Sequence, residues 1–350
     1  MALVPTFTLA LWAVTGLLVG LALLTAAHKA LRAAHERRRA RIEAIVRPSL
    51  LALLAEDDPD PAGLDLSGRG AGSSLEELAT GLLTKLRGED RGVLERLLAA
   101  HGVLERARRR TRRPGPVGRA RAAELLGAAG YVEARPELEL LLSDREPSVR
   151  AAAARALGKL GDPEAVPALL ATLDSRRGVP VGVVTMGLLH IGPAAAPALE
   201  QGLHAQDSPA ARAISAELLG RLGSLSAADD LIGALRADPA PEVRAAAARA
   251  LGRLGAPRAA APLEAALIEE QEPGVRHATA WALGELGDAR GFAGLAGALH
   301  SGEHALARLA ADALSACGPT GLALLRRTAA GGGLGSPEAR ETLGALGASR

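Results

Sequence analysis

The sequence predicts an all-α protein: an α-solenoid of about eight helical-hairpin repeats (period 31–32), preceded by a single transmembrane helix. The repeats are marked by similar strings, such as ALGKLG and ALGRLG, and the glycines that close them recur at nearly constant spacing: Gly130, Gly161, Gly192, Gly223, Gly255, Gly287, Gly318 and Gly347. The decapeptide VRAAAARALG occurs at 149–158 and again at 243–252, three repeats apart. Apolar residues make up 48% of the chain but aromatic residues only 1%. This composition suits closely packed helices of Ala and Leu, and it does not suit a β-sandwich.

Residues 1–28 predict a membrane anchor. Leu3–Ala27 carries no charge, and it is longer than the about 20 residues that a helix needs to cross a bilayer. Basic residues follow this stretch and none precedes it, so we expect the N-terminus outside and the rest of the chain in the cytoplasm. A cleaved signal peptide is the alternative, but it needs a basic start and a shorter apolar core.

The segments between the anchor and the repeats differ in charge and composition. Residues 29–54 predict a basic juxtamembrane arm, 55–74 an acidic flexible linker rich in Pro, Gly and Ser, and 75–114 a helical cap region. We expect two helices in the cap region, around 75–87 and 90–110. The second ends in a basic cluster, Arg106–Arg113. Two interpretations of this cluster stay open: a solvated helix end favoured by the helix dipole, or a contact with anionic lipid headgroups.

Each repeat is predicted to contain two helices. In the second repeat, apolar residues recur at helical spacing between Val149 and Leu160, and Gly161 then ends the helix. A second helix is expected from Val166, with a proline near its start. Similar prolines occur in other repeats, at Pro136, Pro197 and Pro262. Neither helix buries its apolar stripe alone, so the pairs must stack.

The repeat resembles the HEAT repeat, in the short bacterial form of the phycobilisome-lyase HEAT-like proteins. The resemblance rests on "VR" at the start of the first helix, "LGxLGDP" between the helices and "AVPALL" in the second. It covers residues 115–350 and implies a structural ladder of Asp and Arg residues that links neighbouring repeats. The ladder residues that match are Arg119, Asp144, Arg150, Arg212, Asp238, Arg244 and Arg276.

The third repeat departs from this pattern, because Val181 stands where five other repeats have arginine. It marks either a bend in the stack or a docking site. The last two repeats also depart from the pattern, which is typical of capping repeats.

No enzyme signature was found, so the sequence predicts a non-enzymatic protein without cofactor or metal. HEAT-like di-iron oxygenases use His-Glu pairs at the start of repeat helices, but Ala278 follows His277 here. The single cysteine, Cys317, excludes a disulfide within the chain. The repeats carry a net charge of −3, from 23 basic and 26 acidic residues, and few aromatic residues, which argues against nucleic-acid binding. Trp281 is expected to pack in the core or between repeats and not to serve as a ligand platform.

The function predicted from these features is that of a scaffold or adaptor at the inner membrane of a bacterium. In HEAT solenoids the second helices usually line the concave side, so a partner-binding face is expected there. Its candidate residues are Glu164, Glu200, Gln201, His204, Asp229, Asp230, Arg236, Glu264 and Glu269. The set is mildly acidic, which fits either a basic partner segment or a solvated face. The expected partner is an unidentified protein, such as a membrane-embedded enzyme or transporter. The alternative is an enzyme or accessory subunit that uses the groove for a small molecule or cofactor, as a lyase would.

Overall fold

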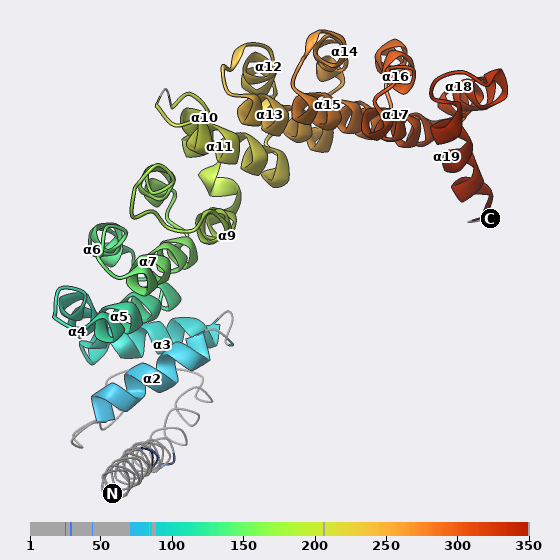
Figure 1. The fold of residues 1–350 in the computed structure, drawn as a ribbon. Coiled ribbons are helices and arrows are strands. Elements are labelled where there is room, and N and C mark those ends of the chain that lie inside the picture. Colours follow the sequence, from blue (N-terminus) through green and yellow to red (C-terminus); the bar gives the residue numbers. More distant parts are fainter. Residues whose placement is uncertain are drawn as a thin grey trace, which may run out of the picture. The chain divides into compact units, whose positions relative to one another are not determined.

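The computed structural model describes residues 71–83, 85, 89–205 and 207–348, with isolated residues at positions 25, 29 and 44. Apart from these isolated residues, the predicted membrane anchor, the juxtamembrane arm and most of the linker lie outside the described residues. The chain divides into two compact units, Met1–Arg106 and Ala107–Arg350. Every regular element in the described ranges is a helix (Figure 1).

Unit 1 contains α2 (Ala71–Leu83) and α3 (Glu89–Ala100), and the unit boundary falls inside α4 (Val103–Arg110). The helix α2 begins inside the segment predicted as linker. The helix predicted over 90–110 is divided into α3 and α4, because Gly102 has a φ of 63° and ends the first of them. The core is formed by leucines at helical spacing, such as Leu94, Leu97 and Leu98, which are fully buried.

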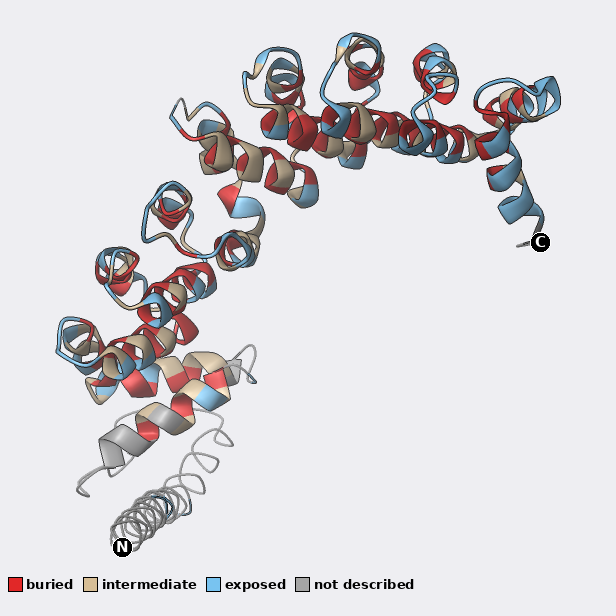
Figure 2. Ribbon diagram, viewed as in Figure 1, coloured by how far each residue is buried: buried red, intermediate tan, exposed pale blue. Residues whose placement is uncertain are grey.

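Unit 2 consists of alternating first and second helices of successive repeats. The first helices are α5 (Pro116–Ala128), α7 (Pro147–Leu160), α9 (Val181–Ile191), α11 (Pro209–Leu222), α13 (Pro241–Leu254), α15 (Pro273–Leu286), α17 (His304–Ala316) and α19 (Ser336–Ala348). The second helices are α6 (Arg135–Leu141), α8 (Val166–Ala171), α10 (Ala196–Leu203), α12 (Ala228–Ala237), α14 (Ala260–Glu269), α16 (Phe292–Leu299) and α18 (Gly318–Gly331). Each first helix packs on the next first helix and on the second helices beside it. Buried residues lie where these helices meet (Figure 2). The described part of unit 2 is therefore an all-α solenoid of helical hairpins.

Most helix ends lie where the sequence predicts them, but Gly347 was predicted to close a helix and lies inside α19. The closing glycine of the second repeat, Gly161, has a φ of 76° and adopts the left-handed conformation, and Gly223, Gly255 and Gly287 do the same. The predicted prolines Pro136, Pro167 and Pro197 lie in the first turn of their helices. Five first helices also begin with a proline, a signal that the sequence analysis did not use.

Neighbouring first helices approach so closely that their contact leaves no room for a side chain. A methyl group on Gly127, Gly158, Gly220, Gly252 or Gly284 would lie within 2.8 Å of an atom in the next first helix. In four of these five contacts the facing residue is alanine. This geometry is consistent with a large apolar fraction that includes so few aromatic side chains, since glycine and alanine let the backbones meet.

The third repeat is built differently from its neighbours. Its first helix, α9, has 11 residues, whereas α7 and α11 have 14 each. Leu189 occupies the position at which five other repeats have the glycine that contacts the next first helix. The contact between α9 and α11 is also much smaller than the contact between α5 and α7.

Among the described residues, Val181–Leu203 is long and apolar enough to cross a membrane by length and composition alone. This is weak support for a membrane span, because Gly192, with a φ of 75°, separates α9 from α10. Neither helix by itself reaches the about 20 residues that a membrane span requires.

Candidate functional sites: the inter-repeat ladder and the second-helix face

An arginine in the first helix of one repeat is joined to an aspartate at the start of the next repeat, just before that repeat's first helix. The Nε and Nη2 atoms of Arg119 donate hydrogen bonds of 2.7 and 2.8 Å to the two carboxylate oxygens of Asp144. Arg212 binds Asp238 in the same way, at 2.7 and 2.9 Å. All four side chains are buried, with exposed fractions between 7% and 9%. This is the planar, bidentate geometry that arginine and carboxylate form best.

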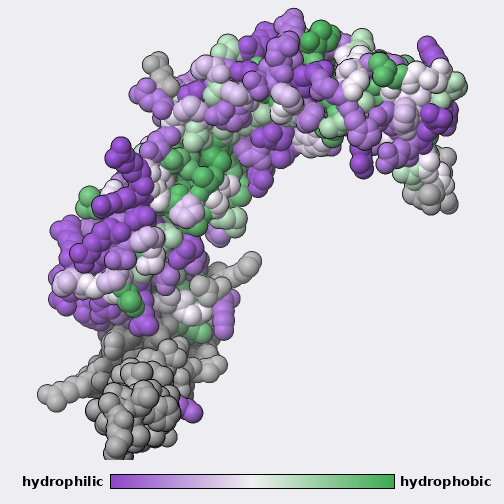
Figure 3. Space-filling view, in the orientation of Figure 1, coloured by the Kyte–Doolittle hydropathy of each residue, from purple (hydrophilic) through white to green (hydrophobic). Residues whose placement is uncertain are grey.

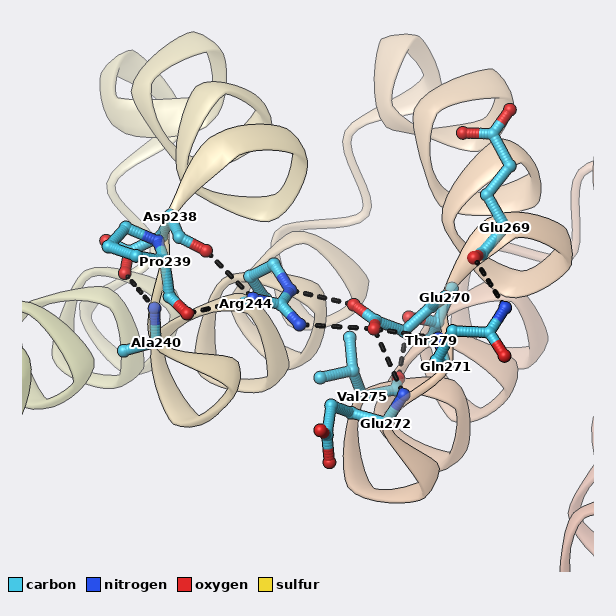
Figure 4. A network of polar contacts seen from close by, with 10 residues as sticks. All are labelled: Asp238, Pro239, Ala240, Arg244, Glu269, Glu270, Gln271, Glu272, Val275 and Thr279. Carbon is cyan, nitrogen blue, oxygen red and sulfur yellow. Dashed lines mark hydrogen bonds and ion pairs between the residues drawn. The ribbon is translucent and has the colours of Figure 1, made fainter.

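The ladder continues through two glutamates that the sequence analysis missed. Arg244 donates to both carboxylate oxygens of Glu270, at 2.7 and 3.1 Å (Figure 4), and Arg276 forms an ion pair with Glu303. Glu270 lies six residues before Arg276, with the same spacing that separates Asp144 from Arg150 and Asp238 from Arg244. This shared spacing predicts Glu270 when either acid is allowed at the position. Glu303 does not lie six residues before an arginine of the ladder, so the spacing did not predict it.

The two aspartates of the ladder also connect to the arginine that follows each of them. The Nη1 of Arg150 donates to the backbone carbonyl of Asp144, and the Nη1 of Arg244 donates to that of Asp238, both at 2.9 Å. The same aspartates accept hydrogen bonds from backbone N–H groups two residues further on. The ladder therefore fixes the turns between repeats as well as the repeats themselves, which is a structural role.

The ladder is interrupted at the third repeat. Arg150 is 7% exposed, and its Nε has no hydrogen-bond partner. Ser175 occupies the position that corresponds to Asp144, and Val181 occupies the next arginine position. The junction between the second and third repeats therefore lacks the carboxylate that the other arginines bind.

Replacing Ser175 with aspartate is expected to complete this rung of the ladder. A carboxylate on the Nε edge of Arg150 should add about 1.5 kcal/mol of stability, the lower range for a hydrogen bond to a charged group. Hydrogen exchange in α7 and α9 should slow accordingly. The control is the same substitution combined with Arg150→Met, which should remove the gain. An equal gain in both backgrounds would show that Arg150 is not involved.

The carboxylates of the ladder have depressed pKa values. Burial alone raises the pKa of Asp144 and of Asp238, but hydrogen bonds from Arg119 and Arg212, and from backbone N–H groups, outweigh this effect, so both values lie below the usual range. Hydrogen bonds from Arg244 lower the pKa of Glu270 from 4.5 to about 2, although burial opposes the shift.

These shifts predict an acid-dependent loosening of the repeats. Since the pKa of Glu270 is lower in the folded state, its stabilising contribution is full above about pH 4.5 and is lost as the pH falls towards 2. We expect amide exchange at the α13–α15 junction, corrected for its intrinsic pH dependence, to accelerate over this interval. In Glu270→Gln the junction should already be loosened at neutral pH and should respond less to acid. An unchanged acid response in the variant would contradict this assignment.

The residues predicted for the partner-binding face lie along the row of second helices, here called the second-helix face. Glu164 lies just before α8, Glu200, Gln201 and His204 in or at the end of α10, Asp229, Asp230 and Arg236 in α12, and Glu264 and Glu269 in α14. Glu200 and Glu264 are partly buried and the others are exposed. The structure thus spreads the set over four successive repeats.

Several of these side chains contact the neighbouring repeat. Glu200 accepts a hydrogen bond of 2.8 Å from Ser226, and Glu264 accepts one of 3.1 Å from the backbone N–H of Gly294. Asp229 forms an exposed ion pair with Arg258 at 3.1 Å, and the Nε2 of His204 lies 3.7 Å from the carboxylate of Asp230. Such exposed contacts contribute little to stability. Because both aspartates are exposed, their carboxylates are accessible to another molecule.

Three of the predicted residues meet at a cavity between α10 and α12. The cavity has a volume of about 450 Å³, and His204, Asp229 and Asp230 lie on its wall. The ladder residues Arg212 and Asp238 form another part of the lining. Here the structure brings together an acidic surface, a hollow and the inter-repeat ladder, which the sequence analysis had treated separately.

The opposite row of first helices carries a charged cluster that the sequence analysis did not identify. Glu217 on α11 lies 2.9 Å from both Arg221 and Arg253 and 3.6 Å from Arg249. The guanidinium of Arg253 lies 5.6 Å from the centre of the Trp281 ring, within the range of a cation–π contact. Trp281 therefore packs against the preceding repeat.

The basic cluster Arg106–Arg113 is partly engaged within unit 2. Arg108 and Arg112 lie 3.1 and 3.2 Å from the carboxylate of Glu137, which is buried. This contact uses two of the arginines for packing against α6. In the part of the chain that the structure describes, no group of three or more His, Cys, Asp or Glu residues is arranged to hold a metal ion.

Known families match this chain over the repeats. The family model described as HEAT repeats matches residues 104–181 and 196–273, and the one described as PBS lyase HEAT-like repeat matches residues 275–301. The stacked hairpins define the class of the α-solenoids. Within that class, residues 104–181 and 196–273 contain HEAT repeats. Among curated proteins, none is significantly similar in sequence.

Solved structures with helical repeats resemble the chain at low identity. Human deoxyhypusine hydroxylase is 21% identical with a TM-score of 0.32, over 81% of this chain and 98% of its own. The CpcE–CpcF complex of phycocyanin lyase from Nostoc sp. PCC7120 is 22% identical with a TM-score of 0.27, over 83% and 97%. A mutant of Kap121p is 14% identical with a TM-score of 0.48, over 89% of this chain and 42% of its own. Similarity at this level carries no information about function.

Proposed function

We propose that this chain is a non-enzymatic scaffold that binds a protein partner through the second-helix face of its HEAT repeats. The observation that supports this most is the cavity of about 450 Å³ whose wall includes Asp229, Asp230 and His204. It lies within a row of carboxylates on successive repeats, most of which are exposed. An acidic surface of this kind favours a basic partner segment, because complementary charge speeds the encounter and selects the partner.

The experiment is crosslinking and capture from cell membranes with the full chain. We expect one defined partner to be captured by the wild-type chain and lost with Asp230→Lys, since the substitution reverses a charge at the cavity. Glu285→Lys is the matched control, because Glu285 is exposed on the first helix α15. Capture that persists in Asp230→Lys, or is lost equally in both variants, would contradict the assignment to this face.

We propose further that residues 1–28 tether the scaffold to the inner membrane of a bacterium, with the repeats in the cytoplasm. Support comes from the sequence: the stretch Leu3–Ala27 is uncharged and has basic residues only on its C-terminal side. A tether raises the local concentration of a membrane-embedded partner, such as an enzyme or transporter, into the millimolar range when the linker spans the distance. Deletion of residues 3–27 should move the protein from the membrane fraction to the soluble fraction. Retention in the membrane fraction after deletion would overturn the tether.

A second candidate function is supported by the same cavity. Its volume falls in the range of about 300–1,000 Å³ that is typical of small-molecule sites. An enzyme or accessory subunit that binds a small molecule or cofactor there is the alternative. Native mass spectrometry of the full chain distinguishes the two, because a small molecule that copurifies with the wild-type chain and is lost from Asp230→Lys would favour the alternative.

A further inference from the structure

We propose that a groove between α7 and α9 binds an acidic helical segment of a partner protein. An apolar side chain of that segment would enter the groove. The groove has a volume of about 240 Å³. The residues of its wall that carry the argument are Arg155, Lys159, Gly182, Met186, Gly187 and His190. It lies on the row of first helices, so it is a second surface beyond the one used in the proposed function.

The groove interrupts a row of charged positions on the first helices of the first five repeats. Six residues before the closing glycine, Glu124 and Arg155 lie 3.6 Å apart in the first two repeats, and Glu217 and Arg249 lie 3.6 Å apart in the fourth and fifth. In the third repeat this position is Met186, whose exposed fraction is 54%. An exposed methionine in place of a charged residue offers an adaptable apolar contact.

Glycines make the surface hollow at this point. A methyl group on Gly158 would lie 2.5 Å from the Cα of Gly187, so α7 and α9 touch backbone to backbone on the floor of the groove. Gly182 has nothing within 4 Å of the place where a side chain would begin. Figure 3 shows a hydrophobic area at α9, between hydrophilic surfaces.

The charges around the groove indicate its occupant. Arg155, Lys159 and His190 contribute to its wall, and no carboxylate does. Arg155 and the Glu124 beside it are both about half exposed, so this pair leaves the guanidinium accessible. An amphipathic helix with an apolar residue flanked by Asp or Glu would therefore match both the apolar floor and the basic rim. The second-helix face is acidic and would select the opposite charge.

The test is selection of displayed random peptides of about 12 residues, roughly 18 Å as a helix, on the full chain. We expect the enriched peptides to combine apolar residues at helical spacing with an excess of Asp and Glu. Their binding should weaken about tenfold or more with Met186→Glu and with Lys159→Glu, as for residues central to an interface. Val117→Glu is the matched control, because Val117 is 65% exposed on the first helix α5 and should leave binding unchanged.

Several outcomes would overturn this proposal. One is the absence of any peptide enrichment that depends on Met186, and another is enrichment of basic or uncharged peptides. Binding to phosphatidylserine vesicles by the chain lacking residues 1–28, if Met186→Glu abolishes it, would assign the surface to lipid. Loss of self-association in Met186→Glu would assign it to a second copy of the chain. Asp230→Lys should leave the selected peptides bound, which separates a failure here from a failure of the proposed function.

Discussion

Replacing Asp238 with alanine is expected to destabilise the junction between α11 and α13 by about 3–5 kcal/mol. The substitution leaves the guanidinium of Arg212, whose side chain is 8% exposed, buried without its carboxylate. It also removes the hydrogen bond of 2.9 Å that the backbone N–H of Ala240 donates to Asp238. Because repeat proteins open locally, hydrogen exchange in α11 and α13 is the suitable measurement.

Two further variants show whether this effect arises from the ladder. Asp229→Ala removes an aspartate whose side chain is 75% exposed, and it should cost less than about 1 kcal/mol. Replacing Arg212 and Asp238 together with Met and Leu should recover most of the lost stability, because no buried charge is then left unpaired. If Asp238→Ala loses as little stability as Asp229→Ala, the buried pair of Arg212 and Asp238 does not stabilise the junction between α11 and α13.

Replacing Gly220 with alanine should destabilise the same junction by about 1–3 kcal/mol, the usual effect of forcing extra atoms into a packed core. The added methyl group would lie 2.6 Å from the Cα of Ala250 on the next first helix, so the two backbones have to move apart. Thermal unfolding and local hydrogen exchange of the full chain measure the loss.

Gly233 provides a matched control, because it lies in α12, is exposed and has nothing within 4 Å of its would-be Cβ. The same change there should stabilise the chain by about 0.5–1 kcal/mol, through the higher helix propensity of alanine. Effects of the same sign at both glycines would contradict the close-packing interpretation.

Much of the repeat architecture could be predicted from the sequence because it depends on local signals. The period of the closing glycines, exemplified by Gly161, marked the repeats, and the apolar spacing marked the helices. Boundaries were less accurate where a local signal was weak: Gly102 was not recognised as a helix end, and α2 begins at Ala71 inside the predicted linker.

The candidate sites were predicted less completely than the fold. The spacing of Arg and Asp indicated a ladder, but each arginine binds an acid in the following repeat, far along the chain, and spacing alone does not show which acid it binds. Glu303 and the cluster around Glu217 depend on contacts between repeats, so no single repeat reveals them. The sequence showed that Val181 replaces the arginine of five other repeats. It did not show what surface α9 would present.

The sequence by itself determined the class of fold, because the regular period of the closing glycines and the Ala–Leu stripes allow no arrangement other than stacked helical pairs. Only the tertiary structure decided how close the stacked helices come, which arginine binds which acid and where the stack leaves a surface uncovered. The physical reason is that these properties arise between repeats. The contact of Gly158 with Gly187, the bond of Arg212 to Asp238 and the exposure of Met186 each depend on residues of two or more hairpins meeting in space.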